Sequence, residues 1–191
     1  MTKCLKMALY FILVGARVIN VMSAFNPLLT YTVRFKKIDV KPNITLDYYS
    51  IDRYKDVQYV NGQITIDSKE IIDNVVGIFY RCDPDGINCE YFQTWKIKDV
   101  CPKLLQKNQM WSRWYESFHP PLVCPVDKVH YKVKNATVDV GPLALIYPQV
   151  TDYQWKVIQK FYANDIFVGS YTIEASIFGY RKKIKSIFTD N

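Results

Sequence analysis

Residues 82–124 read CDPDGINCEYFQTWKIKDVCPKLLQKNQMWSRWYESFHPPLVC, and this stretch decides the fold of the chain. It holds four of the five cysteines and three of the four tryptophans. The sequence on both sides of it alternates between apolar and polar residues in the manner of β-strands. We therefore interpret the stretch as a cross-linked, mostly helical insertion that closes a β-rich body.

Helical spacing replaces alternation inside this insertion. The apolar residues of 90–100 fit a helical period better than a strand period, which predicts a first helical piece there. Pro102 follows, and because proline is costly inside a helix it separates this piece from a second one. The second piece has aromatic residues at positions i, i+3, i+4 and i+7, on one helical face. They are Trp111, Trp114, Tyr115 and Phe118.

Strand patterns flank the insertion on both sides. They occupy residues 26–40, 44–48, 57–66 and 74–81 before it, and 129–133, 136–140, 153–161 and 166–180 after it. Asn61-Gly62 is a strong hairpin signal because both residues tolerate positive φ, so we predict a turn there. Asn164-Asp165 predicts a second turn. The sequence therefore predicts a mainly β, antiparallel fold.

The first residues have the pattern of a secretion signal. A short basic lead precedes ten apolar residues, 7–16, which are too few to span a bilayer as a helix. We predict a signal peptide over residues 1–16, with a second, later cleavage position at Ser23-Ala24. Residues 17–191 then form a single domain. No later stretch is apolar and long enough to cross a membrane, so we expect a secreted, extracellular protein.

The cysteines and sequons agree with export. Cys4 leaves with the signal peptide, and the even number that stays predicts two disulfides. The cysteines concerned are Cys82, Cys89, Cys101 and Cys124. Three pairings are possible, and the sequence alone ranks none of them first. Asn43 and Asn135 each begin an Asn-X-Thr glycosylation sequon.

Charge and motif content exclude several classes of function. The net charge is +7 at pH 7, and the charges are dispersed, unlike those of a nucleic-acid-binding protein. The chain has two histidines and contains no H-E-x-x-H motif, no G-x-S-x-G motif and no glycine-rich phosphate loop. Oxidised cysteines serve neither as nucleophiles nor as metal ligands. We therefore predict a protein that is not an enzyme, with no catalytic residue, metal site, cofactor or nucleic-acid partner.

The aromatic residues carry the positive signal, at 15% of the chain. Trp and Tyr combine an apolar body with a polar tip, which suits the rim of an apolar cavity. Alternation and helical phase select the candidates for the cavity or its rim: Trp95, Trp111, Trp114, Phe118, Trp155, Phe161 and Tyr171. This interpretation predicts a carrier for a hydrophobic small molecule or lipid. In the alternative interpretation the same rings fill a solid core, and the chain is an extracellular protein-interaction module or co-receptor with no ligand.

An ordered set of short motifs resembles a known family. The motifs are C-x₆-C-E-Y-F at 82–92, C-P at 101–102, L-V-C-P at 122–125, D-Y-Q-W-K-V at 152–157 and Y-T-I-E-A-S-I-F-G-Y at 171–180. In this order and spacing they resemble the insect CheB chemosensory proteins, which are similar in turn to the ganglioside activator of lysosomes, a lipid-binding β-cup. The chain departs from the ganglioside activator in having no cysteine in its last long strand, at Val168-Gly169-Ser170.

The resemblance implies an antiparallel β-cup or sandwich with short helices at its mouth, an apolar cavity and two disulfides. It favours the pairing Cys82–Cys89 with Cys101–Cys124. It also implies secretion around cells that sense taste or pheromones, with a membrane receptor or ion channel as a further partner. The basic residues within 181–185 allow transient contact with a membrane surface.

Overall fold

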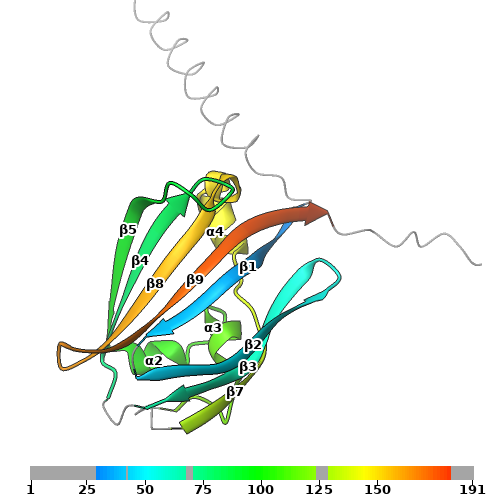
Figure 1. The fold of residues 1–191 in the computed structure, drawn as a ribbon. Helices are drawn as coiled ribbons and strands as arrows, with labels where there is room; N and C mark the ends of the chain where they lie inside the picture. The colour runs from blue at the N-terminus through cyan, green and yellow to red at the C-terminus, as the bar shows by residue number, and fades with distance from the viewer. Residues whose placement is uncertain (1–28, 42, 68–70, 124–128, 182–191) are drawn as a thin grey trace, which may run out of the picture.

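The computed structural model describes residues 29–41, 43–67, 71–123 and 129–181, which form two antiparallel β-sheets and a few short helices (Figure 1). The five-stranded sheet, in the order β1-β9-β8-β4-β5, contains β1 (Leu29–Lys41), β9 (Ile166–Arg181), β8 (Gln154–Ala163), β4 (Asn74–Cys82) and β5 (Glu90–Lys98). The four-stranded sheet, in the order β2-β3-β7-β6, contains β2 (Ile44–Tyr54), β3 (Val57–Ile66), β7 (Val129–Ala136) and β6 (Phe118–His119). The helices are α2 (Val100–Leu104), α3 (Ser112–Tyr115), α4 (Gly141–Ile146) and the 3₁₀-helix η1 (Pro148–Asp152). The predicted mainly β, antiparallel class is confirmed.

The two sheets lie over one another, and the α2–α3 part of the insertion lies between them at one end (Figure 1). At one side, β1 contacts both β2 and β3, so the sheets lie close together there. Figure 1 shows α2 and α3 in the space between the lower ends of the five-stranded sheet and the four-stranded sheet. At the opposite end of the five-stranded sheet, α4 lies beside the β4–β5 loop (Figure 1). The short helices therefore hold the two layers apart at one end of the sandwich.

Long-range pairing builds the larger sheet. β1 pairs with β9 from Leu29 opposite Arg181 to Lys41 opposite Ser170, although these strands lie at the two ends of the described chain. β8 and β9 form a hairpin whose turn residues, Asn164 and Asp165, have φ values of 48° and 63°. The predicted turn at Asn164-Asp165 is confirmed.

The helical prediction for residues 90–100 is wrong, because β5 occupies Glu90–Lys98. The register of β4 with β5 slips between Phe79 and Tyr80, so Phe92 is an extra residue on β5. A bulge of this kind breaks the alternation of apolar and polar residues. The remaining apolar positions imitate a helical spacing, and this led to the wrong prediction.

The turn predicted at Asn61-Gly62 is also wrong, because β3 continues through both residues. The β2–β3 turn is at Lys55 and Asp56 instead. A Cβ added at Gly62 would lie 2.6 Å from the backbone oxygen of Tyr48. Gly62 is therefore required for the close approach of β3 to β2, which has a bulge between Leu46 and Tyr48. Asn61 accepts a hydrogen bond through Oδ1 from the backbone N–H of Asn135 at 2.7 Å.

One further strand prediction is wrong, and three other expectations concern residues outside the described part of the chain. The predicted strand at 136–140 is wrong, because β7 ends at Ala136, residues 137–140 are not in a strand and α4 begins at Gly141. The predicted signal peptide, Cys124 and the basic cluster after Arg181 lie outside the described residues. Among the described residues, no helix is both long and apolar enough to cross a membrane.

Candidate functional site

The candidate site is an apolar cavity of about 60 Å³ between the two sheets. The four-stranded sheet presents isoleucines from β2 and β3 to it, and β8 and β9 present Phe161, Val168 and Tyr171. The insertion covers the remaining side. The full lining is Ile44, Ile64, Ile66, Ile72, Leu104, Tyr115, Phe118, Leu122, Phe161, Val168 and Tyr171, and its exposed atoms are all apolar.

A second cavity, of about 50 Å³, adjoins the first between the five-stranded sheet and the insertion. Its lining is Val75, Ile97, Val100, Lys103, Leu104, Trp111, Tyr115 and Gln159. Leu104 and Tyr115 line both cavities. These two side chains, one from α2 and one from α3, are therefore the partition between them.

The insertion is held in a fixed conformation by its own hydrogen bonds. Ser112 is buried, and its hydroxyl donates to the carbonyl of Gln106 at 2.7 Å and accepts from the backbone N–H of Gln109 at 2.9 Å. Trp111 donates through Nε1 to the carbonyl of Lys103 at 3.2 Å. These bonds tie α3 to α2, and so they set where Leu104 and Tyr115 point.

Two backbone hydrogen bonds attach the insertion to the segment that contains β7. The N–H of Lys134 donates to the carbonyl of Ser117 at 2.9 Å, and the N–H of Asp139 donates to the carbonyl of Met110 at 3.0 Å. Both ends of the α3 region are therefore fixed to the four-stranded side of the molecule. These two bonds hold the α3 side of the cavity against the segment that contains β7.

Aromatic contacts connect the insertion to the strands. The ring of Trp114 lies 5.9 Å from that of Phe35 on β1 and 6.4 Å from that of Tyr171 on β9. The ring of Tyr171 lies 5.5 Å from that of Phe161. The Trp114 side chain is 9% exposed, so it packs as core behind the cavity wall and does not line the cavity.

A polar cluster lies on the boundary between the two cavities. Gln159 on β8 is directly opposite Tyr171 on β9, so their side chains share a face of the sheet. The hydroxyl of Tyr171 donates to Oε1 of Gln159, and the hydroxyl of Tyr115 donates to the same oxygen at 3.3 Å. Burial raises the pKa of Tyr115 and raises that of Tyr171 well above its usual value. Both hydroxyls therefore stay neutral and remain donors at neutral pH.

The structure brings some of the predicted cavity residues together and separates others. Phe118, Phe161 and Tyr171 line the first cavity, and Trp111 lines the second. Trp95 packs on Phe79 of β4, with ring centroids 4.5 Å apart, and lines neither cavity.

Trp155 lies in a separate aromatic group, where its Nε1 donates to the carbonyl of Val150 at 2.8 Å. Its ring contacts those of Phe92, Tyr147 and Tyr153 near α4. Trp155 is 8% exposed, and it contributes to the core at the end of the sheet away from α2 and α3.

Sequence reasoning missed the aliphatic half of the lining and the single amide. The missed residues are Ile44, Ile64, Ile66, Ile72, Leu104, Leu122 and Val168 in the first cavity, and Val75, Ile97, Val100, Lys103 and Gln159 in the second. A signal for Gln159 was present, because it is a polar residue in the alternating series Trp155, Val157, Gln159, Phe161 that otherwise faces the core. A polar residue at such a position is either paired or functional.

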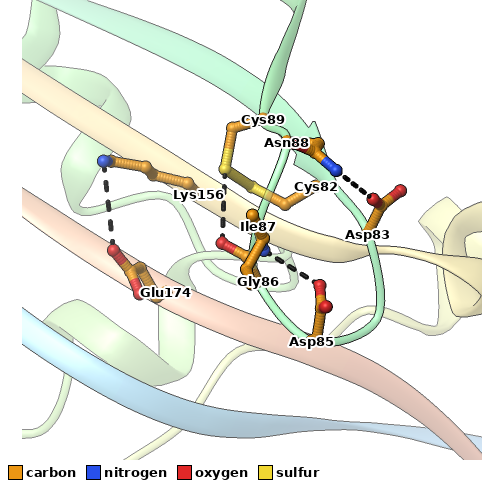
Figure 2. The surroundings of a disulfide bond; sticks show 9 residues. All are labelled: Cys82, Asp83, Asp85, Gly86, Ile87, Asn88, Cys89, Lys156 and Glu174. Atoms are coloured by element: carbon orange, nitrogen blue, oxygen red, sulfur yellow. Dashed lines mark hydrogen bonds and ion pairs between the residues drawn. A yellow bond between two sulfur atoms is a disulfide. The ribbon is translucent and has the colours of Figure 1, made fainter.

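The disulfide Cys82–Cys89 closes the β4–β5 loop, with an S–S distance of 2.01 Å (Figure 2). Within the loop, the backbone N–H of Ile87 donates to Oδ1 of Asp85 at 3.0 Å, and Nδ2 of Asn88 donates to Oδ2 of Asp83 at 2.9 Å (Figure 2). The predicted Cys82–Cys89 bridge is confirmed, which excludes the nested pairing. The Cys101–Cys124 bridge stays a prediction, because Cys124 lies outside the described residues.

Both predicted glycosylation acceptors have exposed side chains. Asn43 donates one hydrogen bond through Nδ2 to the carbonyl of Val168 at 2.9 Å, which leaves its second N–H available. Asn135 lies within the bulge in β7, with a φ of 55°. Glycosylation at either position stays a prediction.

A scan against protein-family models and a search of curated proteins found no match to the chain. In the described part of the chain, no group of three or more His, Cys, Asp and Glu residues is placed to hold a metal ion. The residues that line the two cavities therefore carry the functional argument.

Proposed function

We propose that this protein is a secreted, non-catalytic carrier that binds a hydrophobic small molecule or lipid outside the cell. The observation that carries the proposal is the first cavity, whose exposed lining is wholly apolar and which lies between two sheets held apart by the insertion. An apolar guest placed there gains free energy by leaving water, at roughly 0.8 kcal/mol for each CH₂ group buried. The Cys82–Cys89 disulfide is consistent with an extracellular protein.

The size of the cavities defines how binding would occur. The volumes of about 60 and 50 Å³ are smaller than the ~150 Å³ of an engineered cavity that binds benzene, and far smaller than the ~300–1,000 Å³ of common ligand pockets. A guest therefore has to displace side chains. Leu104 is the side chain to move, because it lines both cavities and, unlike Tyr115, makes no hydrogen bond to Gln159.

The proposed biological setting is chemosensory perception. It rests on the ordered cysteine and aromatic motifs that resemble the CheB proteins. In this setting the carrier presents its guest to a membrane receptor or an ion channel, and contact with a membrane surface is transient. The sequence supports this role through its motifs, and the cavity supports the chemical class of the guest.

A second candidate function is favoured by a different observation. The cavities are small, and three large apolar side chains are exposed around the β4–β5 loop and α4: Ile87 at 61%, Leu145 at 53% and Ile146 at 84%. Figure 1 shows α4 beside the β4–β5 loop, and exposed apolar surface on neighbouring segments is typical of a protein-protein contact. The chain would then be an interaction module with a filled core.

Uptake of a neutral fluorescent probe, N-phenyl-1-naphthylamine, separates the two functions. The carrier is expected to bind it saturably, and organic extraction of the purified protein followed by mass spectrometry is expected to release an apolar compound. Ile64→Phe places extra carbons in the first cavity and is expected to weaken uptake about tenfold or more. Ile71→Phe changes a side chain that is 58% exposed and serves as the control. Absence of both uptake and extractable compound would favour the interaction module.

A further inference from the structure

The two cavities differ in chemistry, and this difference indicates which way a guest would lie. The first cavity exposes only apolar atoms, whereas the second has Gln159 and Lys103 in its lining. A chain with one polar end therefore matches the joined site in one orientation only. Its apolar part would lie between the sheets, and its polar end would lie under α2.

The polar groups of the second cavity are hydrogen-bond donors. Oε1 of Gln159 already accepts from the hydroxyls of Tyr115 and Tyr171, which leaves the amide Nε2 as its available group. Among the described residues, Nε2 of Gln159 has no hydrogen-bond partner. Because both hydroxyls donate to the amide oxygen, the amide is oriented with its N–H₂ group away from the tyrosines.

Lys103 adds a second donor and a positive charge. Its Nζ donates to the carbonyl of Lys98 at 2.5 Å, and an ammonium group has three N–H donors, so two of them stay available. Within the described part of the chain Lys103 forms no ion pair. The side chain is half-buried and lines the second cavity beside Trp111.

We infer that the guest is an apolar chain that ends in an acceptor group, and that a carboxylate, as in a fatty acid, is preferred. Nε2 of Gln159 donates to one oxygen of this carboxylate, and Lys103 neutralises its charge. The inference rests on the proposed carrier function and names the class of ligand for the same site. A hydrocarbon would leave both donors without a partner, and this costs affinity.

Competition for bound N-phenyl-1-naphthylamine tests the inference, using decanoate, methyl decanoate, decan-1-ol and decane as competitors. The expected order of affinity is decanoate, then the methyl ester, then the alcohol and decane. A hydrogen bond to a charged group corresponds to roughly a tenfold preference or more. The affinity for decanoate should therefore exceed the affinity for decane by about that factor.

Gln159→Glu is the decisive variant. A glutamate keeps an oxygen for both tyrosine hydroxyls, so the cluster is preserved, but it removes the amide donor. The preference for decanoate should disappear, while displacement of the probe by decane stays within about twofold. Lys103→Met should weaken the binding of decanoate and leave the affinity for methyl decanoate unchanged. Lys160→Met, which removes a charge from the opposite face of β8, is the control and should change neither.

The failure of the inference is distinguishable from the failure of the proposed function. If the wild-type protein binds the probe and all four competitors displace it equally, the acceptor-group inference is overturned and the carrier function stands. If the preference for decanoate survives in Gln159→Glu, Gln159 is not its source and the inference is also overturned. If the folded wild-type protein binds neither probe nor competitor, both proposals fall. Circular dichroism establishes that each variant is folded.

Discussion

Leu104→Ala tests the partition between the two cavities. Leu104 lines both of them and is half-buried, so its truncation removes the wall and joins the two spaces. Leu→Ala substitutions in cores cost about 2–5 kcal/mol, and a half-buried position lies near the lower end, at about 2–3 kcal/mol. For a chain of 191 residues this corresponds to a Tm lower by about 4–12 °C.

The same substitution should strengthen binding of an apolar guest. In the wild-type protein a guest must push Leu104 aside and expose it, which costs about 1–2 kcal/mol for a half-buried leucine. The variant avoids this cost, and its joined cavity approaches the ~150 Å³ that accommodates benzene. Affinity for N-phenyl-1-naphthylamine should therefore rise about 5- to 30-fold. Stability and affinity are expected to change in opposite directions.

Fluorescence titration with the naphthylamine probe and thermal unfolding followed by circular dichroism measure the two effects. Leu105→Ala is the matched control, because the neighbouring leucine is 59% exposed and lines neither cavity. It should change stability by less than about 0.5 kcal/mol and leave affinity as it was. If Leu104→Ala lowers the Tm as expected but leaves probe affinity unchanged or weaker, the guest does not occupy the joined cavity and the reasoning is refuted.

Three further predictions concern stability. Gly62→Ala should lower the free energy of unfolding by about 1–3 kcal/mol in urea titration, because the added Cβ meets the backbone oxygen of Tyr48 and not a flexible side chain; an unchanged value would contradict the close approach. The raised pKa of Tyr171 means that the folded state keeps a proton that the unfolded state loses above about pH 10. Unfolding free energy should therefore fall as the pH rises above about 10, and Tyr171→Phe should flatten this fall; equal slopes in both proteins would exclude this tyrosine as the cause. Replacing Cys82 and Cys89 together by serine should cost about 2.5 kcal/mol, from the chain entropy of a short loop, without changing probe uptake. Loss of uptake in that folded variant would show that the loop, at the far end of the sheet in Figure 1, is coupled to the cavities.

Several parts of the fold follow from local sequence, and the failures share one physical cause. The alternation in β8 and the turn at Asn164-Asp165 are visible in the sequence because each depends on residues that are neighbours in the chain. The errors at residues 90–100 and at Asn61-Gly62 both occur at bulges, at Phe92 in β5 and where β3 pairs with β2 and β7. A bulge depends on the partner strand, so its effect on periodicity is invisible in a single strand.

In the candidate site too, some residues could be predicted from the sequence and others depend on tertiary packing. Large aromatic rings stand out in a sequence, and of those predicted for the cavity Phe118, Phe161 and Tyr171 line the first one. Trp95 and Trp155 stand out equally, yet they pack elsewhere. In the sequence, the isoleucines on β2 and β3 cannot be distinguished from ordinary strand residues. Only the packing of one sheet over the other makes them a cavity wall.

By itself, the sequence determined the β class, an even set of cysteines outside the predicted signal, the absence of common catalytic motifs and the aromatic richness of the insertion. Tertiary structure alone decided that 90–98 is a strand, that Cys82 pairs with Cys89, and that Leu104 and Tyr115 divide the space between the sheets. It also placed the amide of Gln159 under two tyrosine hydroxyls. Periodicity is set by neighbours along the chain, whereas a cavity is enclosed by residues that are distant in sequence and meet only after the strands have paired.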